Sequence, residues 1–262
     1  MAEENMKKPP GGDIEHGSHT NIGHRKENQD SILIKNNSNK FNSQFYLFAV
    51  ADGMGGHKAG CIASRMACDQ LANYFANYKN FPNLTISVLG SQLTKSIYRI
   101  DRDIRLSSFK DCNSEDMGTT LSCLCIFKSQ SVIAHVGDSR IYRLRDGFLS
   151  CLTVDHTFVQ DMIFEGEVDP KDANTHPLRH VLTSAVGAGE PLAFIDVRID
   201  PLKRNDRFLL CTDGLSDTID ESKIMEIFSQ DNVPTDIAIN LVSEALQQGA
   251  KDNITAMVIF IG

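Results

Sequence analysis

Four aspartates of the sequence lie at the ends of apolar segments, each beside a glycine or an asparagine. A single Asp-Gly pair is typical of a turn. Four such positions at the ends of core strands indicate more, because a carboxylate there is held rigidly and points out of the sheet. Together they predict an oxygen-rich cleft, formed by Asp52, Asp138, Asp213 and Asp252.

A cluster of divalent cations is the simplest purpose for such a cleft. Neighbouring carboxylates repel one another, and their pKa values rise unless cations neutralise them. Oxygen ligands suit Mg²⁺ and Mn²⁺, and two such ions can share a water, lower its pKa and hold a phosphoryl group for attack. Arg25, just before a predicted strand, is the candidate phosphate ligand because a guanidinium grips phosphate with two parallel hydrogen bonds.

Short apolar or alternating segments predict the strands that position these residues, and apolar residues at helical spacing predict the helices. The polar segment 35–40 predicts a turn, and Asp146-Gly147 predicts a hairpin. Runs of strands separated by runs of helices favour an α+β fold with mostly antiparallel sheets. The predicted strands are 31–34, 45–51, 119–127, 131–136, 140–144, 194–199, 207–211 and 254–261, and the predicted helices are 61–78, 84–106, 158–165, 221–229 and 234–248.

The chain is expected to form one domain over residues 14–262, preceded by a flexible tail. Residues 1–13 are polar and contain Pro-Pro-Gly-Gly, which predicts the tail. The hydrophobic pattern weakens between residues 155 and 190, a segment that contains Gly166, Pro170 and Pro177. We expect this segment to be an excursion from the core rather than a separate domain.

Composition excludes several classes of protein. The chain has 262 residues, 41% of them hydrophobic, which is ample for one large core, and its net charge of -8 argues against a nucleic-acid partner. The 7 cysteines are odd in number and form no Cys-x-x-Cys zinc pattern, so we expect reduced thiols in a cytoplasmic protein. No signal peptide or membrane span is predicted.

The motifs around the four aspartates identify a family. Taken together and in this order, they resemble the metal-dependent protein phosphatases, the PPM or type 2C family, and especially its bacterial branch, over residues 15–262. The matching segments are GHRKENQD (23–30), VADGMGGH (50–57), DMGTT (116–120), HVGDSR (135–140), LTVDHT (152–157), HPLRHVLT (176–183), CTDGL (211–215) and KDNIT (251–255).

The resemblance implies a fold and an activity. The expected fold is a β-sandwich of two antiparallel sheets flanked by α-helices, with a flap at about 155–190 bordering the active site. The expected activity is hydrolysis of phosphoserine and phosphothreonine on proteins by a metal-activated water, without a phosphoenzyme. The cofactors would be two Mg²⁺ or Mn²⁺ ions and a weaker third one, and the substrates would be targets of a serine/threonine kinase in a signalling system. We expect a monomer.

The resemblance also implies a role for each site residue. Asp52 would bridge two metals, and the Gly53 carbonyl would ligate one of them. Asp213 and Asp252 would complete the shell of the first metal, and Asp138 would hold the third together with Asp213. Two further residues complete the predicted site: Arg25 binding the phosphate of the substrate, and Asp30 orienting metal-bound water.

Two residues depart from the family pattern. Many eukaryotic members have a histidine, proposed as the general acid, where this chain has Met54, a feature that bacterial members share. A metal-bound water or His57 could supply the proton instead. Gln29 stands where many members have glutamate. A catalytically weak or inactive phosphoprotein-binding regulator is the alternative function, and the retained Arg25 and aspartates argue against it.

Overall fold

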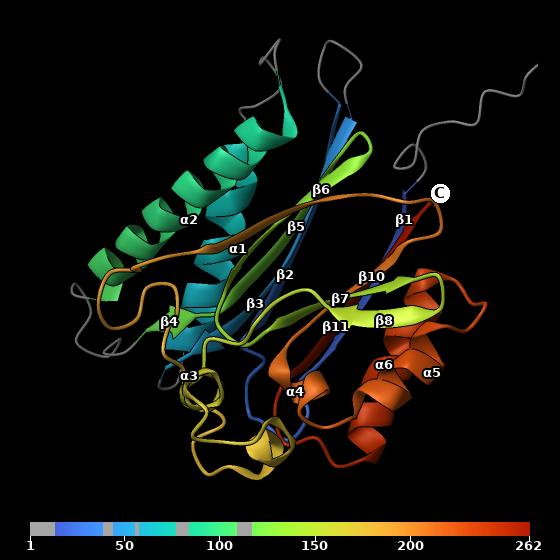
Figure 1. Ribbon diagram of the computed structural model, residues 1–262. Coiled ribbons are helices and arrows are strands. Elements are labelled where there is room, and N and C mark those ends of the chain that lie inside the picture. The colour runs from blue at the N-terminus through green and yellow to red at the C-terminus, as the bar shows by residue number, and fades with distance from the viewer. Residues whose placement is uncertain (1–13, 39–43, 56–57, 77–83, 109–116) are drawn as a thin grey trace, which may run out of the picture.

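The protein is a sandwich of two antiparallel β-sheets with helices on both outer faces (Figure 1). This computed structural model describes residues 14–38, 44–55, 58–76, 84–108 and 117–262. The predicted α+β class and the two-sheet sandwich are confirmed. The predicted tail, residues 1–13, and His57 lie outside the described residues.

The two sheets divide the strands between them. The first has the order β1-β11-β10-β7-β8, and the second has the order β2-β3-β5-β6-β9, with β4 paired to the end of β3. The first sheet comprises β1 (Ile14–Asn21), β7 (Arg140–Arg145), β8 (Phe148–Cys151), β10 (Arg207–Cys211) and β11 (Ile254–Ile261). The second comprises β2 (Asp30–Ser38), β3 (Gln44–Met54), β4 (Gly118–Thr119), β5 (Leu121–Phe127), β6 (Gln130–Val136) and β9 (Asp196–Pro201).

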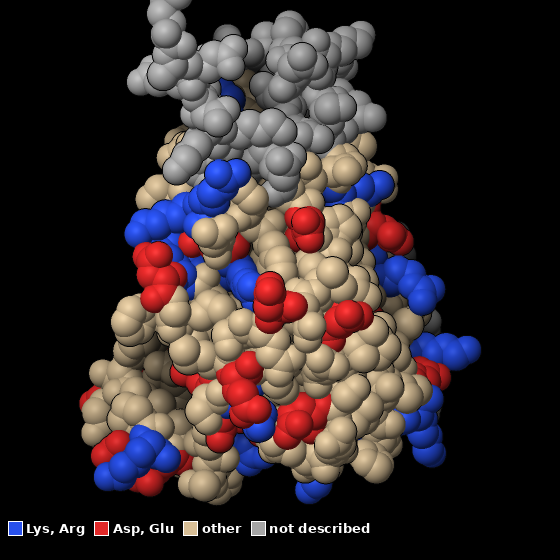
Figure 2. Space-filling view, turned by 90° about the vertical axis from the view of Figure 1, so that its right-hand side faces the viewer, with Lys and Arg blue, Asp and Glu red and all other residues tan. Residues whose placement is uncertain are grey.

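Each sheet carries its own pair of helices. Helices α1 (Ala59–Ala76) and α2 (Ile86–Ser108) pack on the second sheet, whereas α5 (Glu221–Phe228) and α6 (Pro234–Gln247) cover the first (Figure 1). Acidic and basic side chains lie interspersed on the side of the molecule that carries α5 and α6 (Figure 2). Buried apolar side chains therefore form three layers, one under each helix pair and one between the sheets. The layer between the sheets includes Phe48 and Phe208. No described helix has the length and apolar character needed to cross a bilayer.

The structure differs from the sequence prediction at two places near the N-terminal end. The turn predicted at 35–40 is wrong for its described part, because β2 continues to Ser38 and stays in register with β3 as far as Gln44. An edge strand needs an apolar residue only on its inner face, so polar residues do not end it. Strand β1 was not predicted, since its residues are mostly polar. Its place comes from an eight-residue pairing with β11.

The predicted flap is tied to the core at both ends. It contains α3 (Phe158–Glu165), with the predicted bounds, and a short 3₁₀ helix (Pro170–Thr175). Thr157 caps α3 through its side chain, and Gly166 ends the helix with a left-handed backbone. The first end is tied to the core by the His156 N–H, which donates to the Gly137 carbonyl, and the second by a bridge between Val186 and Thr119. A further bridge joins Thr157 to Leu182 and so closes the base of the flap. The flap is thus an insertion anchored on the sandwich.

Candidate active site

A cleft of about 970 Å³ opens at the end of the sandwich where the short helix α4 (Asp213–Ser216) lies. The structure brings almost all predicted site residues to this cleft. Asp30 is the exception, since it lies behind the lining, opposite Asp52 in the register of β2 and β3. The predicted residues that line the cleft are Arg25, Asp52, Gly53, Asp138, Asp213 and Asp252.

Asp52 is held by hydrogen bonds on both sides of its backbone. Its N–H donates to Thr120 Oγ1 at 2.9 Å, and its C=O accepts from Thr119 Oγ1 and from Thr120 N–H, both at 2.8 Å. The next residue must be glycine, because a Cβ on Gly53 would lie 2.1 Å from the carbonyl oxygen of Gly60 at the start of α1. These contacts fix the main chain at Asp52 and thereby the position of its carboxylate.

Burial and the charges of neighbouring carboxylates raise the pKa values of Asp52, Asp138 and Asp213. Burial, followed by the nearby charges of Asp30, Asp213 and Asp138, holds the pKa of Asp52 well above its usual range. Burial and the Asp213 charge do the same to the pKa of Asp138. The pKa of Asp213 is raised to about 6 by burial and by its neighbours Asp217 and Asp252. This is the electrostatic cost that cations would relieve.

Asp30 joins the two sheets beneath the cleft. Its Oδ2 atom accepts hydrogen bonds from Thr212 Oγ1 at 2.9 Å and from Thr255 Oγ1 at 2.6 Å, both in the opposite sheet or its extension. Burial raises its pKa to about 7, although the two threonine hydroxyls favour the charged form. The Asp30 side chain is therefore fixed in place next to Asp52.

Two buried oxygens of this cluster fit a cation site. Asp30 Oδ1 and Asp213 Oδ1 have no hydrogen-bond partner among the described residues. Buried acceptors without a donor are costly, and an ion or a water is the usual explanation. The predicted ligands offer oxygen atoms alone, which is the donor set that Mg²⁺ and Mn²⁺ prefer. The residues present therefore fit divalent cations.

Arg25 forms an ion pair with Asp252, a contact that was not predicted from the sequence. Its Nη2 atom lies 2.5 Å from Asp252 Oδ2, and this hydrogen-bonded ion pair raises the pKa of Arg25. The Arg25 side chain is 59% exposed, so it remains accessible from the cleft. Asn253 clamps the loop that carries Arg25, since its side chain donates to the carbonyls of Ile22 and Glu27 and accepts from Gln29 N–H. Arg25 is thereby placed beside the predicted metal ligands.

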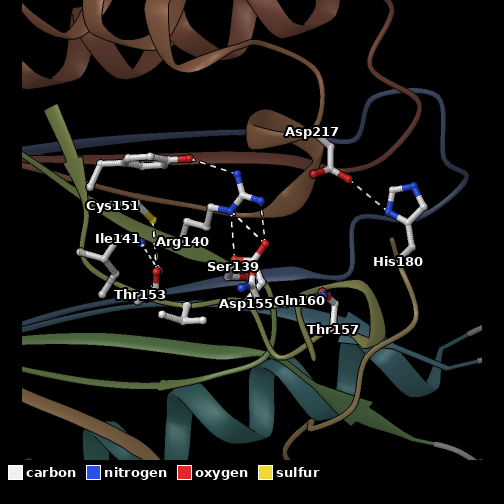
Figure 3. Close-up of polar contacts among 12 residues, drawn as sticks. Ser139, Arg140, Ile141, Cys151, Thr153, Asp155, Thr157, Gln160, His180 and Asp217 are labelled. Atoms are coloured by element: carbon white, nitrogen blue, oxygen red, sulfur yellow. Dashed lines mark hydrogen bonds and ion pairs between the residues drawn. The ribbon is translucent and has the colours of Figure 1, made fainter. Parts of the chain in front are cut away.

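Two residues with no predicted role also line the cleft. His180 of the flap and Asp217 at the end of α4 are paired, with Nδ1 and Oδ2 3.1 Å apart (Figure 3). With Asp213 they form a group whose ligand atoms lie within 4.8 Å of one another. The signal for Asp217 was its position four residues after Asp213, which places both on one side of a helical turn. The signal for His180 was weaker, since it depends on how the flap folds back.

A forked ion pair anchors the start of the flap. Arg140 follows the loop of Asp138, and its Nε and Nη2 atoms donate to Asp155 Oδ1 and Oδ2 at 3.0 and 2.6 Å (Figure 3). Arg140 Nη1 also donates to the hydroxyl of the buried Tyr142 at 3.2 Å. The first residue of the flap is thus fixed to β7.

The raised pKa values predict how stability depends on pH when cations are removed. The pKa values of the Asp30 and Asp213 carboxyls are near 4 in an unfolded chain, and burial raises them to about 7 and about 6 in the folded one. Between pH 4 and 7 the folded state binds more protons, so their contribution to stability should fall as pH rises. Thermal unfolding in EDTA should show a lower Tm at pH 7.5 than at pH 5, and Asp30→Asn should flatten this dependence. A Tm difference unchanged by Asp30→Asn would contradict this account.

Comparison with known proteins decides the family. The sequence profile of protein phosphatase 2C matches residues 19–235. The chain belongs to the protein phosphatase 2C family. Among relatives of this phosphatase, the serine/threonine phosphatase stp of Listeria monocytogenes is 34% identical over 238 residues, 91% of each chain. The serine/threonine protein phosphatase PstP of Mycobacterium tuberculosis is 34% identical over 227 residues, 87% of this chain and 42% of that protein.

Solved structures agree with this assignment. The serine/threonine phosphatase of S. agalactiae superimposes with a TM-score of 0.85 at 29% identity, covering 95% of this chain and all of that one. The catalytic domain of PstP in complex with two manganese ions superimposes with a TM-score of 0.80 at 29% identity, covering 95% and 98%. The phosphatase 2C described here is thus a protein serine/threonine phosphatase, a hydrolase of a metal-dependent family that acts on phosphoproteins. Nothing in these comparisons favours the inactive alternative.

Proposed function

We propose that this phosphatase removes phosphate from serine and threonine with divalent cations held by the aspartates of the cleft. The convergence of Asp52, Asp138, Asp213 and Asp252 in one cleft beside an arginine carries this proposal. The two buried carboxylate oxygens without partners among the described residues support it, because a cation at Asp213 and a cation-bound water at Asp30 would satisfy them. Two Mg²⁺ or Mn²⁺ ions and a weaker third one fit the number of carboxylates.

The ligands divide into a core set and a weaker one. Asp52 would hold two ions, and Gly53 would offer its carbonyl to one of them. Asp213 and Asp252 would complete the ligands of the first ion. Asp138 would hold the third ion with Asp213. Bound cations of this kind lower the pKa of water and stabilise the charge that develops on a phosphoryl group.

The remaining residues act on the substrate and the water. Arg25 binds the phosphate oxygens through its guanidinium, which orients the phosphorus toward the aspartates. Asp30 lies beside Asp52, and its Oδ1 atom would accept a hydrogen bond from the attacking water and so orient that water toward phosphorus. Met54 has no proton to donate, so protonation of the leaving oxygen falls to water in the cleft.

The substrates, the oligomeric state and the cellular compartment are part of the same proposal. We infer that the substrates are targets of a serine/threonine kinase and that the enzyme works as a monomer in the cytoplasm. The six described cysteines are free thiols, four of them buried, as is usual in a reducing compartment. Size-exclusion chromatography with light scattering tests the monomer directly.

Removal of cations tests the proposed chemistry. After treatment with EDTA, hydrolysis of p-nitrophenyl phosphate and of a phosphothreonine peptide should fall by at least about a hundredfold, since several kcal/mol of transition-state stabilisation is lost. Mn²⁺ or Mg²⁺ should restore turnover and raise Tm. EDTA presaturated with Ca²⁺ and Mn²⁺ controls for effects of the chelator itself. Full turnover after exhaustive chelation would refute a cation-dependent mechanism.

A further inference from the structure

His156 uses its backbone and its ring to hold the residue before Asp138. Its backbone N–H donates to the carbonyl of Gly137 at 2.8 Å, and its Nδ1 atom accepts from the N–H of Gly137 at 3.2 Å. Both polar groups of the Gly137 main chain are therefore bonded to one histidine. The side chain is only 6% exposed.

The ring is itself oriented by a carboxylate. A backbone N–H can only donate, so Nδ1 acts as an acceptor and the ring hydrogen lies on Nε2. That nitrogen lies 3.2 Å from Oδ2 of Asp196 in the edge strand β9. The ring also packs against His135 and Phe194, with centroids 4.9 and 5.2 Å away. These contacts leave the imidazole one orientation.

His156 also joins both ends of the flap. It lies one residue into the flap, and its carbonyl accepts the N–H of Thr183 at 2.9 Å, near the other end. The adjacent residues Thr157 and Leu182 form a bridge, and Phe158 N–H donates to the Val181 carbonyl. A single residue thus connects the two ends of the flap with the loop that carries Asp138.

The Asp138 loop has little freedom apart from this contact. Gly137 has a φ of +108°, and a Cβ there would lie 2.6 Å from Thr120. On the other side of Asp138, the Ser139 hydroxyl lies 2.7 Å from Thr120 Oγ1, and the Ser139 carbonyl accepts from Ser122. The loop is fixed to β5 after Asp138, whereas His156 holds it before Asp138.

We propose that His156 is a positioning residue that sets the place of Asp138 and couples it to the flap. The inference rests on the proposed function, in which Asp138 holds the third cation. Residues behind a metal ligand change metal affinity about tenfold to a hundredfold when they are replaced. Loss of the Nδ1 acceptor should therefore lower the affinity for the third cation and leave the affinity for the cations held by Asp52 unchanged.

Two substitutions separate the functions of the two ring nitrogens. His156→Asn keeps an acceptor near the position of Nδ1, whereas the longer side chain of His156→Gln places its amide near the position of Nε2, away from the Gly137 N–H. Asp196→Ala removes the group that orients the ring and, being at a residue whose side chain is 48% exposed, opens no core cavity. Glu190→Ala, an exposed acidic residue near the end of the flap, is the matched control.

Calorimetric titration of the full chain with Mn²⁺ measures the effect. We expect the wild-type protein to bind two Mn²⁺ ions tightly and one weakly. His156→Gln should lower only the affinity for the weakly bound ion, by about tenfold. His156→Asn should stay within about threefold of wild type, and Asp196→Ala should show a smaller change in the same direction as His156→Gln. Equal weakening in the Asn and Gln variants, or uniform weakening of all ions, would overturn the role of Nδ1. If the histidine variants fail to fold, an Asp196→Ala titration identical to that of Glu190→Ala would overturn it.

Trypsin cleavage after Lys171 or Arg179 tests the coupling to the flap. Mn²⁺ at a concentration that fills the weak site should slow cleavage in wild type but not in His156→Gln. Equal protection in both proteins would overturn the coupling. If the wild-type titration shows no weakly bound Mn²⁺, both the proposed third cation and this inference are wrong. If a weakly bound Mn²⁺ is present and His156→Gln does not change its affinity, only this inference is wrong.

Discussion

Replacing Asp213 by asparagine should lower turnover by about a thousandfold, because a carboxylate shared between cation positions contributes on the order of 4 kcal/mol to the transition state. The fold should remain intact. Asp213 lies in a cluster of mutually repelling carboxylates, and burial raises its pKa to about 6. Removal of one charge should therefore leave the Tm of the cation-free protein equal or higher, while the rise in Tm on adding Mn²⁺ should largely vanish. Hydrolysis of p-nitrophenyl phosphate and differential scanning fluorimetry measure the two effects.

The matched control is Asp231→Asn, which makes the same chemical change at an exposed residue outside the cleft lining. It should keep wild-type turnover and the full response to Mn²⁺. Wild-type activity in Asp213→Asn would mean that the catalytic cations lie elsewhere. A large loss of Tm without Mn²⁺ would mean that Asp213 supports the fold rather than the chemistry.

Replacing Arg25 by alanine should raise KM for a phosphothreonine peptide by about thirtyfold, with a smaller change in kcat. Charge-assisted hydrogen bonds to phosphate are worth about 2 kcal/mol, and this binding is lost. Inorganic phosphate should also become a weaker competitive inhibitor. Steady-state kinetics at saturating Mn²⁺ measure both constants.

Arg25→Lys separates charge from shape, since lysine keeps the charge but lacks the planar fork. We expect its KM to lie between those of wild type and Arg25→Ala. Saturating Mn²⁺ is essential to the design, because Arg25 also contacts Asp252 and its loss changes the surroundings of a predicted ligand. A defect confined to kcat, or one abolished by more Mn²⁺, would contradict a phosphate-binding role.

Much of the cleft lining was predictable because its residues flank strongly apolar strands. The bounds of β10 and β11 match the prediction, and nearly all their residues are buried. Such strands can lie only in the core, so the polar residue at each end must appear at the rim of the sandwich. Asp213 and Asp252 were found for this reason.

Contacts formed across long sequence separations could not be predicted in the same way. Strand β1 is mostly polar and is recognisable only beside β11. The pair of His180 and Asp217 depends on how the flap folds back over α4, and no periodic pattern encodes that path. Arg25 and Asp252 were each predicted, but their ion pair depends on the loop that Asn253 clamps.

The ligand set is divided between the two sheets. Asp52 belongs to β3 of one sheet, and Asp213 and Asp252 flank strands of the other. Asp138 lies in the loop that joins β6 of the one sheet to β7 of the other. The distance between the two halves is therefore set by the apolar layer between the sheets, which includes Phe48 and Phe208, and by the hydrogen bonds of Asp30 to Thr212 and Thr255. The interior of the sandwich therefore acts as a spacer between the candidate ligands. A change in its side-chain volumes should alter their separation as well as the stability of the fold.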